Sequence, residues 1–180
     1  MIIQKEFYFV RHGQTDHNLV EGTEKGDHPG EVSLNETGRN QAKAIEPVIS
    51  SLPFQTVCSS PLKRAQETKE VITASLRVDH REVMDLGECS CQIWREMAQL
   101  GMYPPVPADG VVRCFMDQVR SGINQVLSLP GTSLVVAHGG VHWAICCWMG
   151  LEGYEWFIGN CVPVHFLIGD QGKWIAKKLV

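Results

Sequence analysis

The sequence has no excess of positive charge, and this absence excludes a broad class of functions. Its 16 lysine and arginine residues are outnumbered by 20 aspartate and glutamate residues, which gives a formal net charge of −4 at pH 7. A protein that binds nucleic acid through its overall field needs the opposite balance. We therefore expect no nucleic-acid partner, and any anion binding has to come from a local cluster of cations.

Long apolar segments are also missing. The longest uncharged apolar run, residues 143–151, is too short to cross a bilayer. The first ten residues, MIIQKEFYFV, place two charges before a strand-like run, which is not the layout of a signal peptide. These observations predict a cytoplasmic protein with no membrane partner.

The cysteines lack the pairing of a metal or redox site. There are seven of them, an odd number with irregular spacing, and none forms a C-x2-C motif. Two close pairs, Cys89 with Cys91 and Cys146 with Cys147, do not have the spacing of a structural zinc site. Reduced thiols that act as small apolar side chains fit this pattern best.

What the sequence does contain is the alternation of an α/β domain. Its 180 residues, 44% of them apolar, are enough for one domain with a buried core. Strand-like runs at residues 7–10, 56–58 and 132–137 alternate with helical patterns, and two final strands flank a Gly-Asp-Gln-Gly turn. We expect a single domain over residues 1–180 with a largely parallel sheet. Residues 77–110 give mixed signals.

Polar residues follow three of these predicted strands. Arg11, His12 and Gly13 follow the first strand, the segment SSPLKR with Arg64 follows the second, and His138 with two glycines follows the third. In parallel sheets, ligands gather beyond the carboxyl ends of the strands. The three segments are therefore expected to lie side by side.

Together these residues have the chemistry of a phosphoryl site. The guanidiniums of Arg11 and Arg64 are forked donors that match phosphate oxygens. The imidazoles of His12 and His138 add donors or a nucleophile. Taken singly, each residue is ordinarily a surface cation or a satisfied polar group, and it is their coincidence at three strand ends that predicts a pocket.

Two further features of these segments bear on that pocket. Three glycines would let the backbone approach a ligand, and helices that begin near Pro61 and Gly140 would point their positive ends at it; the glycines are Gly13, Gly139 and Gly140. His142 lies four residues after His138, which raises a metal site as an alternative. No third ligand has a convincing spacing, so we expect no metal.

Four segments, VRHGQTDHN, SLNETGRNQA, CSSPLKRAQET and VVAHGGVHWAI, resemble the histidine phosphatase superfamily, also called the phosphoglycerate mutase-like family. The resemblance spans nearly the whole chain. It implies a three-layer α/β/α fold around a mostly parallel sheet, catalysis by His12 and His138 through a phosphohistidine on His12, and no metal or other cofactor. The implied phosphate site consists of Arg11, Asn18, Arg64, His138 and the backbone of Gly139.

The proton donor is where the sequence departs from the family pattern. Related phosphatases often carry a glutamate shortly before a glycine, as in L-R-E-x-x-x-G. In HREVMDLGEC, Glu82 lies five residues before Gly87, one more than the usual spacing. We expect Glu82 to be the catalytic acid through a one-residue bulge, with Asp85 and Glu88 as alternatives. Some relatives that act on phosphohistidine lack this acid.

The resemblance also bears on the kind of substrate. Phosphoglycerate mutases of the family are longer and keep added basic residues, whereas Arg95 is the one basic residue between Glu88 and Gly110. We expect residues 77–110 to be a substrate-facing insert that offers Ile93, Trp94, Met97, Leu100, Met102 and Tyr103, some of them core.

The predicted function is that of a phosphomonoesterase acting on a small phosphorylated metabolite or a phosphoprotein. The alternatives are a phosphohistidine phosphatase, a phosphoglycerate-type mutase and a catalytically weak phosphate-binding scaffold. The sequence carries no signal for a particular oligomeric state.

Overall fold

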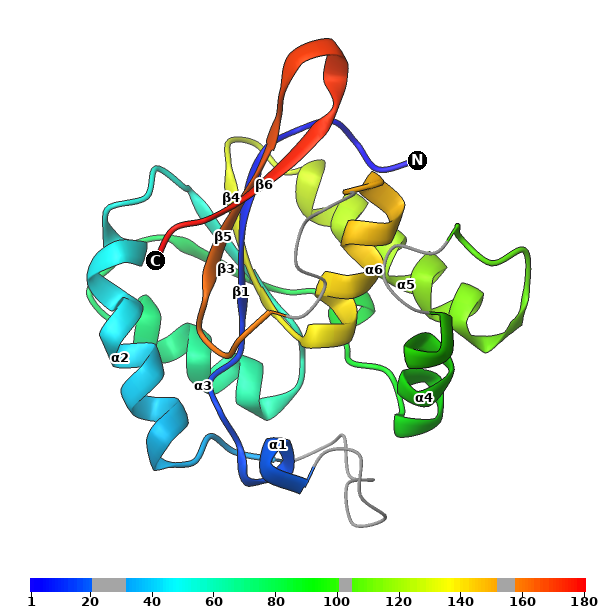
Figure 1. Ribbon diagram of the computed structural model, residues 1–180. Helices are drawn as coiled ribbons and strands as arrows, with labels where there is room; N and C mark the ends of the chain where they lie inside the picture. Colours follow the sequence, from blue (N-terminus) through cyan, green and yellow to red (C-terminus); the bar gives the residue numbers. More distant parts are fainter. Residues whose placement is uncertain (21–31, 101–104, 152–157) are drawn as a thin grey trace.

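A computed structural model describes residues 1–20, 32–100, 105–151 and 158–180 (Figure 1). The strands are β1 (Phe7–Arg11), β2 (Thr56–Ser59), β3 (Asp79–Glu82), β4 (Ser133–Ala137), β5 (Pro163–Ile168) and β6 (Trp174–Lys178). The helices are α1 (Asp16–Val20), α2 (Glu36–Ser50), α3 (Lys63–Ile72), α4 (Cys91–Leu100), α5 (Gly110–Leu127) and α6 (Gly139–Met149), with short 3-10 turns η1 (Met84–Leu86) and η2 (Asp170–Gly172).

The strands form one sheet in the order β3-β2-β4-β1-β5-β6. The pairs β3–β2, β2–β4 and β4–β1 are parallel, whereas β5 runs antiparallel to β1 and to β6. Helices α2 and α3 lie on one side of the sheet, and α5 and α6 lie on the other (Figure 1). The predicted three-layer α/β/α fold is therefore confirmed.

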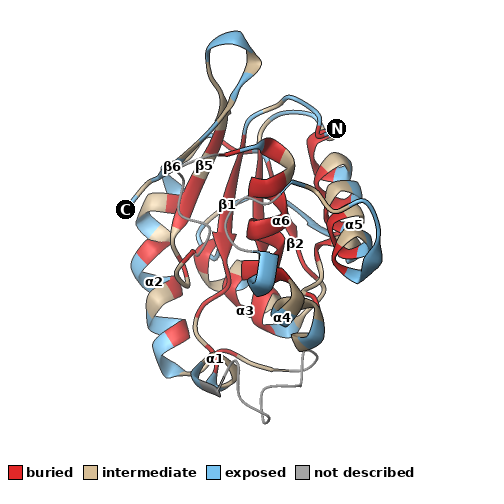
Figure 2. Cartoon of the chain, turned by 45° about the vertical axis from the view of Figure 1, so that its right-hand side comes forward, coloured by how far each residue is buried: buried red, intermediate tan, exposed pale blue. Residues whose placement is uncertain are grey.

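The central strands are apolar on both faces because helices cover both faces. In β1, Phe7 and Phe9 pack in the cluster formed with α5 and α6, while Tyr8 and Val10 pack in the cluster formed with α2 and α3. Figure 2 shows buried residues along the strands and on the inward sides of the helices. This two-sided core holds the carboxyl ends of β1, β2 and β4 in fixed positions.

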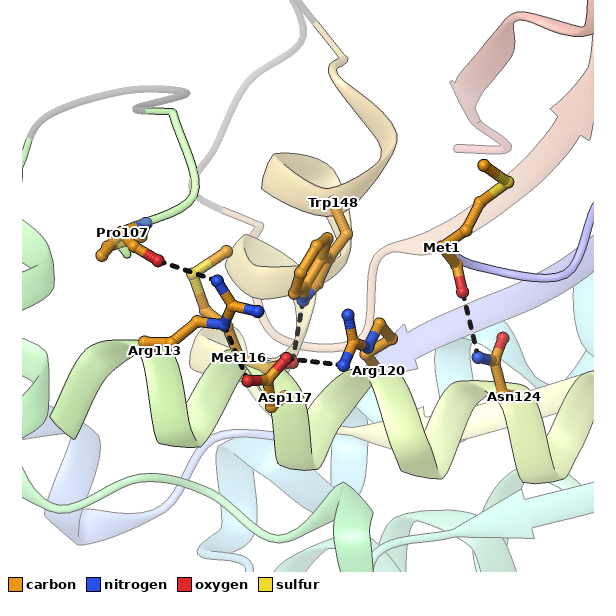
Figure 3. Close-up of polar contacts among 8 residues, drawn as sticks. All are labelled: Met1, Pro107, Arg113, Met116, Asp117, Arg120, Asn124 and Trp148. Carbon is orange, nitrogen blue, oxygen red and sulfur yellow. Dashed lines mark hydrogen bonds and ion pairs between the residues drawn. The ribbon is translucent and has the colours of Figure 1, made fainter. Parts of the chain in front are cut away.

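Helix α6 is anchored to α5 through the Trp148 side chain (Figure 3). Its indole Nε1 donates to the Met116 carbonyl oxygen over 2.8 Å. The guanidiniums of Arg113 and Arg120 lie 5.4 and 4.5 Å from the centre of the Trp148 ring, and Asp117 pairs with both at 2.7 and 2.8 Å. These contacts hold the C-terminal half of α6 against α5.

Strand β3 was not predicted from the sequence, because it is exposed and carries no apolar pattern. All four of its residues, Asp79 to Glu82, are exposed. It pairs with β2 along one side at the edge of the sheet, so it needs no alternation of apolar and polar residues. By contrast, the expected strands at 56–58 and 132–137 correspond to β2 and β4, and the final hairpin is formed by β5 and β6.

Residues 77–110 include β3, η1 and α4. The η1 turn packs closely on α5. The distance shows this: a Cβ atom added to Gly122 of α5 would lie only 2.9 Å from Cβ of Asp85 in η1. Met102 and Tyr103, which were expected in the substrate-facing insert, lie outside the described residues. Among the helices that the structure does describe, none has the length and apolar character of a membrane span.

Candidate active site

Three neighbouring strands converge on one site at their carboxyl ends. Arg11 ends β1, and the backbone N–H of His12 donates to the Ala137 carbonyl at the end of β4 over 2.9 Å. The backbone N–H of Ser60, just beyond β2, donates to the Val136 carbonyl over 3.0 Å. The fold thus brings together the three segments that sequence analysis singled out.

The imidazole of His12 has a defined tautomer. Its Nδ1 atom lies 2.7 Å from the carbonyl oxygen of Gly13, which can only accept a hydrogen bond, so the proton is on Nδ1. The Nε2 atom then carries the lone pair, and it accepts a hydrogen bond of 3.2 Å from Nε of Arg64. Burial, together with the nearby Arg64 cation, holds the pKa of His12 well below its usual value. His12 is therefore neutral at pH 7 and presents Nε2 as a nucleophile.

The second imidazole, His138, lies beside the first. The ring centres of His12 and His138 are 5.1 Å apart in an edge-to-face arrangement. His138 immediately precedes α6, and its Nε2 atom lies 2.7 Å from Oγ of Ser60. Burial, followed by the charges of the surrounding His12, Arg64 and Arg11, lowers the pKa of His138 well below its usual value.

Both arginines of the site are withdrawn from solvent. The exposed fractions are 4% for Arg11 and 3% for Arg64. Arg11 donates from a terminal guanidinium nitrogen to the Ile158 carbonyl over 2.9 Å. The Arg64 backbone is tied to the site through Thr68, whose hydroxyl donates to the Arg64 carbonyl and accepts from the Gly13 N–H, at 2.7 and 3.0 Å. Two buried cations beside two neutral imidazoles make a site that favours an anion.

The glycines of the site permit close contacts between elements. A Cβ atom on Gly13 would lie 2.5 Å from the Gly38 carbonyl oxygen, so a side chain there would push β1 away from α2. A Cβ atom on Gly139 would lie 3.5 Å from the guanidinium carbon of Arg11 and 3.4 Å from Cζ2 of Trp94. Trp94 on α4 therefore reaches the edge of the arginine cluster.

Asn18 lies in α1 and contacts His12 through a neighbouring asparagine. Its Oδ1 atom accepts hydrogen bonds from the Thr15 N–H and hydroxyl at 3.0 and 3.1 Å. Asn160 connects it to the nucleophile, because its Nδ2 atom donates to the His12 carbonyl at 2.8 Å and lies 3.5 Å from Asn18 Oδ1. Sequence analysis did not identify Asn160, which lies between α6 and β5 at a position that no local pattern marks.

The three candidate acids occupy different surroundings. Glu82 is exposed at the end of β3, where its carboxylate accepts from Gln66 over 3.3 Å. The Asp85 carboxylate accepts hydrogen bonds from two side chains of α5, the Ser121 hydroxyl at 2.7 Å and the Gln125 amide at 2.8 Å.

The Glu88 carboxylate instead contacts the first turn of α6. It accepts hydrogen bonds from the backbone N–H groups of Gly140 at 3.1 Å and Cys89 at 3.0 Å. Burial raises its pKa, although these two hydrogen bonds and the charges of Arg64 and Arg11 act in the opposite direction. Glu88 is thus the candidate acid that lies beside the arginine and histidine cluster.

His142 does not join His138 in a shared ligand set. It is buried in the core, with its ring centre 5.5 Å from that of Phe9 and 5.9 Å from that of Phe166. Within the described ranges, no group of three or more His, Cys, Asp or Glu side chains could hold a metal ion. The seven cysteines are free thiols.

Comparison with known proteins agrees with this geometry. The family model of the histidine phosphatase superfamily (branch 1) matches residues 7–178. The chain belongs to the histidine phosphatase superfamily. Its strand-end motifs and mostly parallel sheet are those that the resemblance implied.

Two curated relatives come from bacteria. Over 96% of this chain, the sequence is 43% identical to the agropine synthesis reductase of Rhizobium rhizogenes, of which the match covers 41%. It is 35% identical to the uncharacterized phosphatase PhoE of Bacillus subtilis (strain 168), over 44% of this chain and 39% of that protein. The matched part of the chain thus spans about two fifths of the length of each relative.

Solved structures show the same fold. The alpha-ribazole phosphatase from Shigella flexneri superposes with a TM-score of 0.70 at 19% identity, covering 97% of this chain and 96% of that one. YhfR of Bacillus stearothermophilus gives a TM-score of 0.72 at 18% identity, with the same coverage of 97% and 96%. These likenesses show the fold, and the matching family model shows the superfamily.

Proposed function

We propose that this chain is a phosphoric monoester hydrolase that works through a phosphohistidine on Nε2 of His12. The observation that carries the proposal is the 2.7 Å contact between His12 Nδ1 and the Gly13 carbonyl. It leaves a neutral Nε2 lone pair directed at the Arg64 guanidinium. A nucleophile beside a buried forked donor is the arrangement that phosphoryl transfer needs.

In the first step, His12 Nε2 attacks phosphorus, the Nε2–P bond forms, and the bond from phosphorus to the leaving oxygen breaks. A phosphoryl group has to replace the contact between Arg64 Nε and His12 Nε2 in order to be attacked. Arg11, Arg64 and His138 then stabilise the charge on the equatorial oxygens. The leaving alkoxide takes a proton from a carboxylic acid.

In the second step, water attacks the phosphohistidine on the same phosphorus. The Nε2–P bond breaks, inorganic phosphate leaves, and His12 returns to its neutral form. The carboxylate produced in the first step accepts the proton of the attacking water. The acid is thereby restored, and the cycle consumes one water for each ester.

We infer that this acid is Glu88, in the role that the motif spacing assigned to Glu82. Its support is the contact with Gly140, in the first turn of the helix that follows His138. Burial raises the pKa of Glu88, which shifts it toward the protonated form that a general acid requires. Glu82 is exposed and bonded to Gln66 instead.

The substrate class that we propose is a small phosphorylated metabolite. Relatives named for alpha-ribazole phosphate and for phosphoserine support a small molecule over a phosphoprotein. Trp94, near Arg11 and Gly139, supports the expectation that residues 77–110 face the substrate and offer it an apolar surface. The free thiols favour a reducing compartment such as the cytoplasm.

The alternatives differ in what they need from the site. A phosphohistidine substrate leaves as an imidazole and needs little help from an acid, so a well-placed Glu88 favours an ester. A mutase needs further cations for a substrate carboxylate, and Arg95 is the one basic residue between Glu88 and Gly110. A non-catalytic scaffold would not need a nucleophile with a defined tautomer.

The test is a release assay for inorganic phosphate, run on para-nitrophenyl phosphate and a panel of alkyl phosphates and phosphohistidine peptides, with EDTA present throughout. We expect turnover by the native chain and none above background by His12→Ala. Activity that disappears on chelation would point to a metal enzyme. Binding of phosphate without turnover on any substrate would favour the scaffold.

A further inference from the structure

Ser60 connects the β2 strand end to the second histidine of the site. Both residues are fully buried, and Ser60 Oγ lies 2.7 Å from Nε2 of His138. The same oxygen accepts a hydrogen bond of 3.2 Å from the backbone N–H of Leu62. A serine hydroxyl can donate one hydrogen bond and accept two. How Ser60 divides these roles decides which nitrogen of His138 carries the proton.

Two arrangements of the hydrogen are compatible with the 2.7 Å contact. If His138 donated from Nε2, the hydroxyl hydrogen of Ser60 would need another acceptor, and no other contact among the described residues provides one. If Ser60 donates to Nε2, its hydrogen is used and Oγ still accepts from Leu62. Each arrangement leaves one buried donor without a partner among the described residues: the Ser60 hydroxyl in the first, and the Nδ1–H group of His138 in the second. Such a donor costs about 1–3 kcal/mol, so the arrangements differ in what can satisfy it. A phosphoryl oxygen bound at His12 can accept from the His138 ring, whose centre lies 5.1 Å from that of His12, and this favours the second arrangement.

We propose that Ser60 is a positioning residue that holds neutral His138 in the tautomer protonated on Nδ1. Within the described residues, Nδ1 of His138 is buried and has no hydrogen-bond partner. In this tautomer it is an N–H donor without an acceptor in the described ranges of the chain. The group that it suits is an oxygen of the phosphoryl substrate, so the catalytic part of this inference rests on the proposed function.

The charges around His138 are consistent with a neutral ring. The groups that face it are His12, Arg64 and Arg11, which disfavour a further positive charge. A neutral imidazole has one donor nitrogen, so its orientation matters, whereas an imidazolium would donate from both nitrogens. Control of the tautomer is useful only because the ring stays neutral.

The two histidines then share a tautomer but present opposite chemistry to the substrate. His12 donates a hydrogen bond from Nδ1 to the Gly13 carbonyl, so the lone pair of Nε2 is left for phosphorus. His138 accepts a hydrogen bond from the Ser60 hydroxyl at Nε2, so the N–H of Nδ1 is left for a phosphoryl oxygen. The backbone carbonyl of Gly13 thus fixes the tautomer of the nucleophile His12, and the hydroxyl of Ser60 fixes the tautomer of His138, which stabilises the phosphoryl oxygens.

The direct test is the tautomer of His138 in full-length protein labelled with ¹⁵N in its histidine rings. Long-range ¹H–¹⁵N NMR distinguishes the protonated from the unprotonated ring nitrogen, and a His138→Gln spectrum assigns the signals. We expect His138 to be protonated on Nδ1 at pH 7.5. A proton on Nε2 in the native chain would overturn the proposal, whether or not the protein hydrolyses phosphate esters.

Ser60→Ala, Ser60→Thr and Ser59→Ala then test the role of the hydroxyl. Ser59 is an equally buried neighbour whose Oγ accepts from Gln66 at 3.1 Å, so it is a matched control. We expect Ser60→Ala to convert His138 partly to the Nε2 tautomer and to lower kcat/KM about tenfold, the effect of losing one buried hydrogen bond.

Ser60→Thr keeps the hydroxyl and is expected to retain the native tautomer, and Ser59→Ala is expected to change neither property. Melting temperatures identify any variant that fails to fold, in which case the native spectrum alone decides. A folded Ser60→Ala with the native tautomer would contradict the proposal. If Ser60→Ala changes the tautomer of His138 but the native chain hydrolyses no phosphate ester, the role of Ser60 stands and the proposed function is contradicted.

Discussion

Nε of Arg64 lies 3.2 Å from Nε2 of His12, the nitrogen that the Gly13 contact leaves unprotonated. The guanidinium thus covers the position at which a phosphoryl group has to bind in order to be attacked. Arg64 comes from the first turn of α3, and His12 follows β1, so two layers of the fold meet at this contact. The catalytic account depends on this pair.

Arg64→Ala is expected to lower kcat/KM by about 10²–10³, the scale for the loss of one preorganised charged donor. Arg64→Lys should recover only part of this loss, because an ammonium cannot offer the forked donor. Steady-state kinetics on one phosphomonoester measure both effects. Arg39→Ala is the control, since Arg39 lies on the surface and pairs with Glu67 at 3.6 Å. A loss below about threefold in Arg64→Ala would place this arginine outside the reaction.

Glu88→Gln is expected to slow alkyl phosphate hydrolysis by about 10²–10⁴, the usual contribution of a general acid. Phosphorylation of His12 by para-nitrophenyl phosphate should be nearly unaffected, because para-nitrophenolate leaves without a proton. The matched controls are Glu82→Gln and Asp85→Asn, which we expect to behave like the native chain on both substrates. If Glu82→Gln alone impairs the alkyl esters, the assignment from motif spacing was correct and Glu88 has another role.

Gly140→Ala tests the position of Glu88 without changing its charge. A Cβ atom on Gly140 would lie 2.3 Å from Oε1 of Glu88, so the carboxylate has to move. Alkyl phosphate turnover is expected to fall on the order of 10²-fold, the cost of misplacing a catalytic group by about 1 Å. Gly87→Ala is the control, because a Cβ atom added there would lie 3.4 Å from the nearest atom, the Met84 carbonyl oxygen. Equal activities of the two variants would separate Glu88 from proton transfer.

The lowered pKa values of His12 and His138 predict how stability depends on pH. In the unfolded chain these histidines take up protons below about pH 6.5, whereas in the folded chain they stay neutral to a lower pH. The unfolded state therefore binds more protons in this window, and the free energy of unfolding decreases as the pH falls below about 6.5.

Urea unfolding at a series of pH values measures this slope. His138→Gln should make the decrease shallower, because it removes one of the two imidazoles whose pKa burial lowers. A free energy of unfolding that stays constant from about pH 6.5 downward would mean that the site histidines are not buried in neutral form.

The strand-end residues could be predicted from the sequence because each belongs to a local pattern. Arg11 and His12 end an apolar strand, Arg64 lies one turn after Pro61, and His138 precedes two glycines at the start of a helix. The rule that ligands gather at the carboxyl ends of parallel strands then places them together. No contact between distant side chains has to be known for this inference.

The surroundings of the acids could not be predicted in the same way. Spacing selected Glu82, but the path of the chain after β3 depends on the η1 turn and on how closely Asp85 packs against Gly122. That packing is a tertiary contact, and it brings Glu88 to α6 while Glu82 stays exposed. The role of Ser60 was also hidden, although it lies within the SSPLKR motif, because its partner is 78 residues away.

The most direct test of the central claim is to trap the phosphoenzyme. The native chain is mixed with ³²P-labelled phosphomonoester, quenched in base, digested and analysed by mass spectrometry. We predict an acid-labile, base-stable label on the peptide that contains His12, and no label in His12→Ala. Label that persists in His12→Ala, or that resides on another residue of the native chain, would contradict the account.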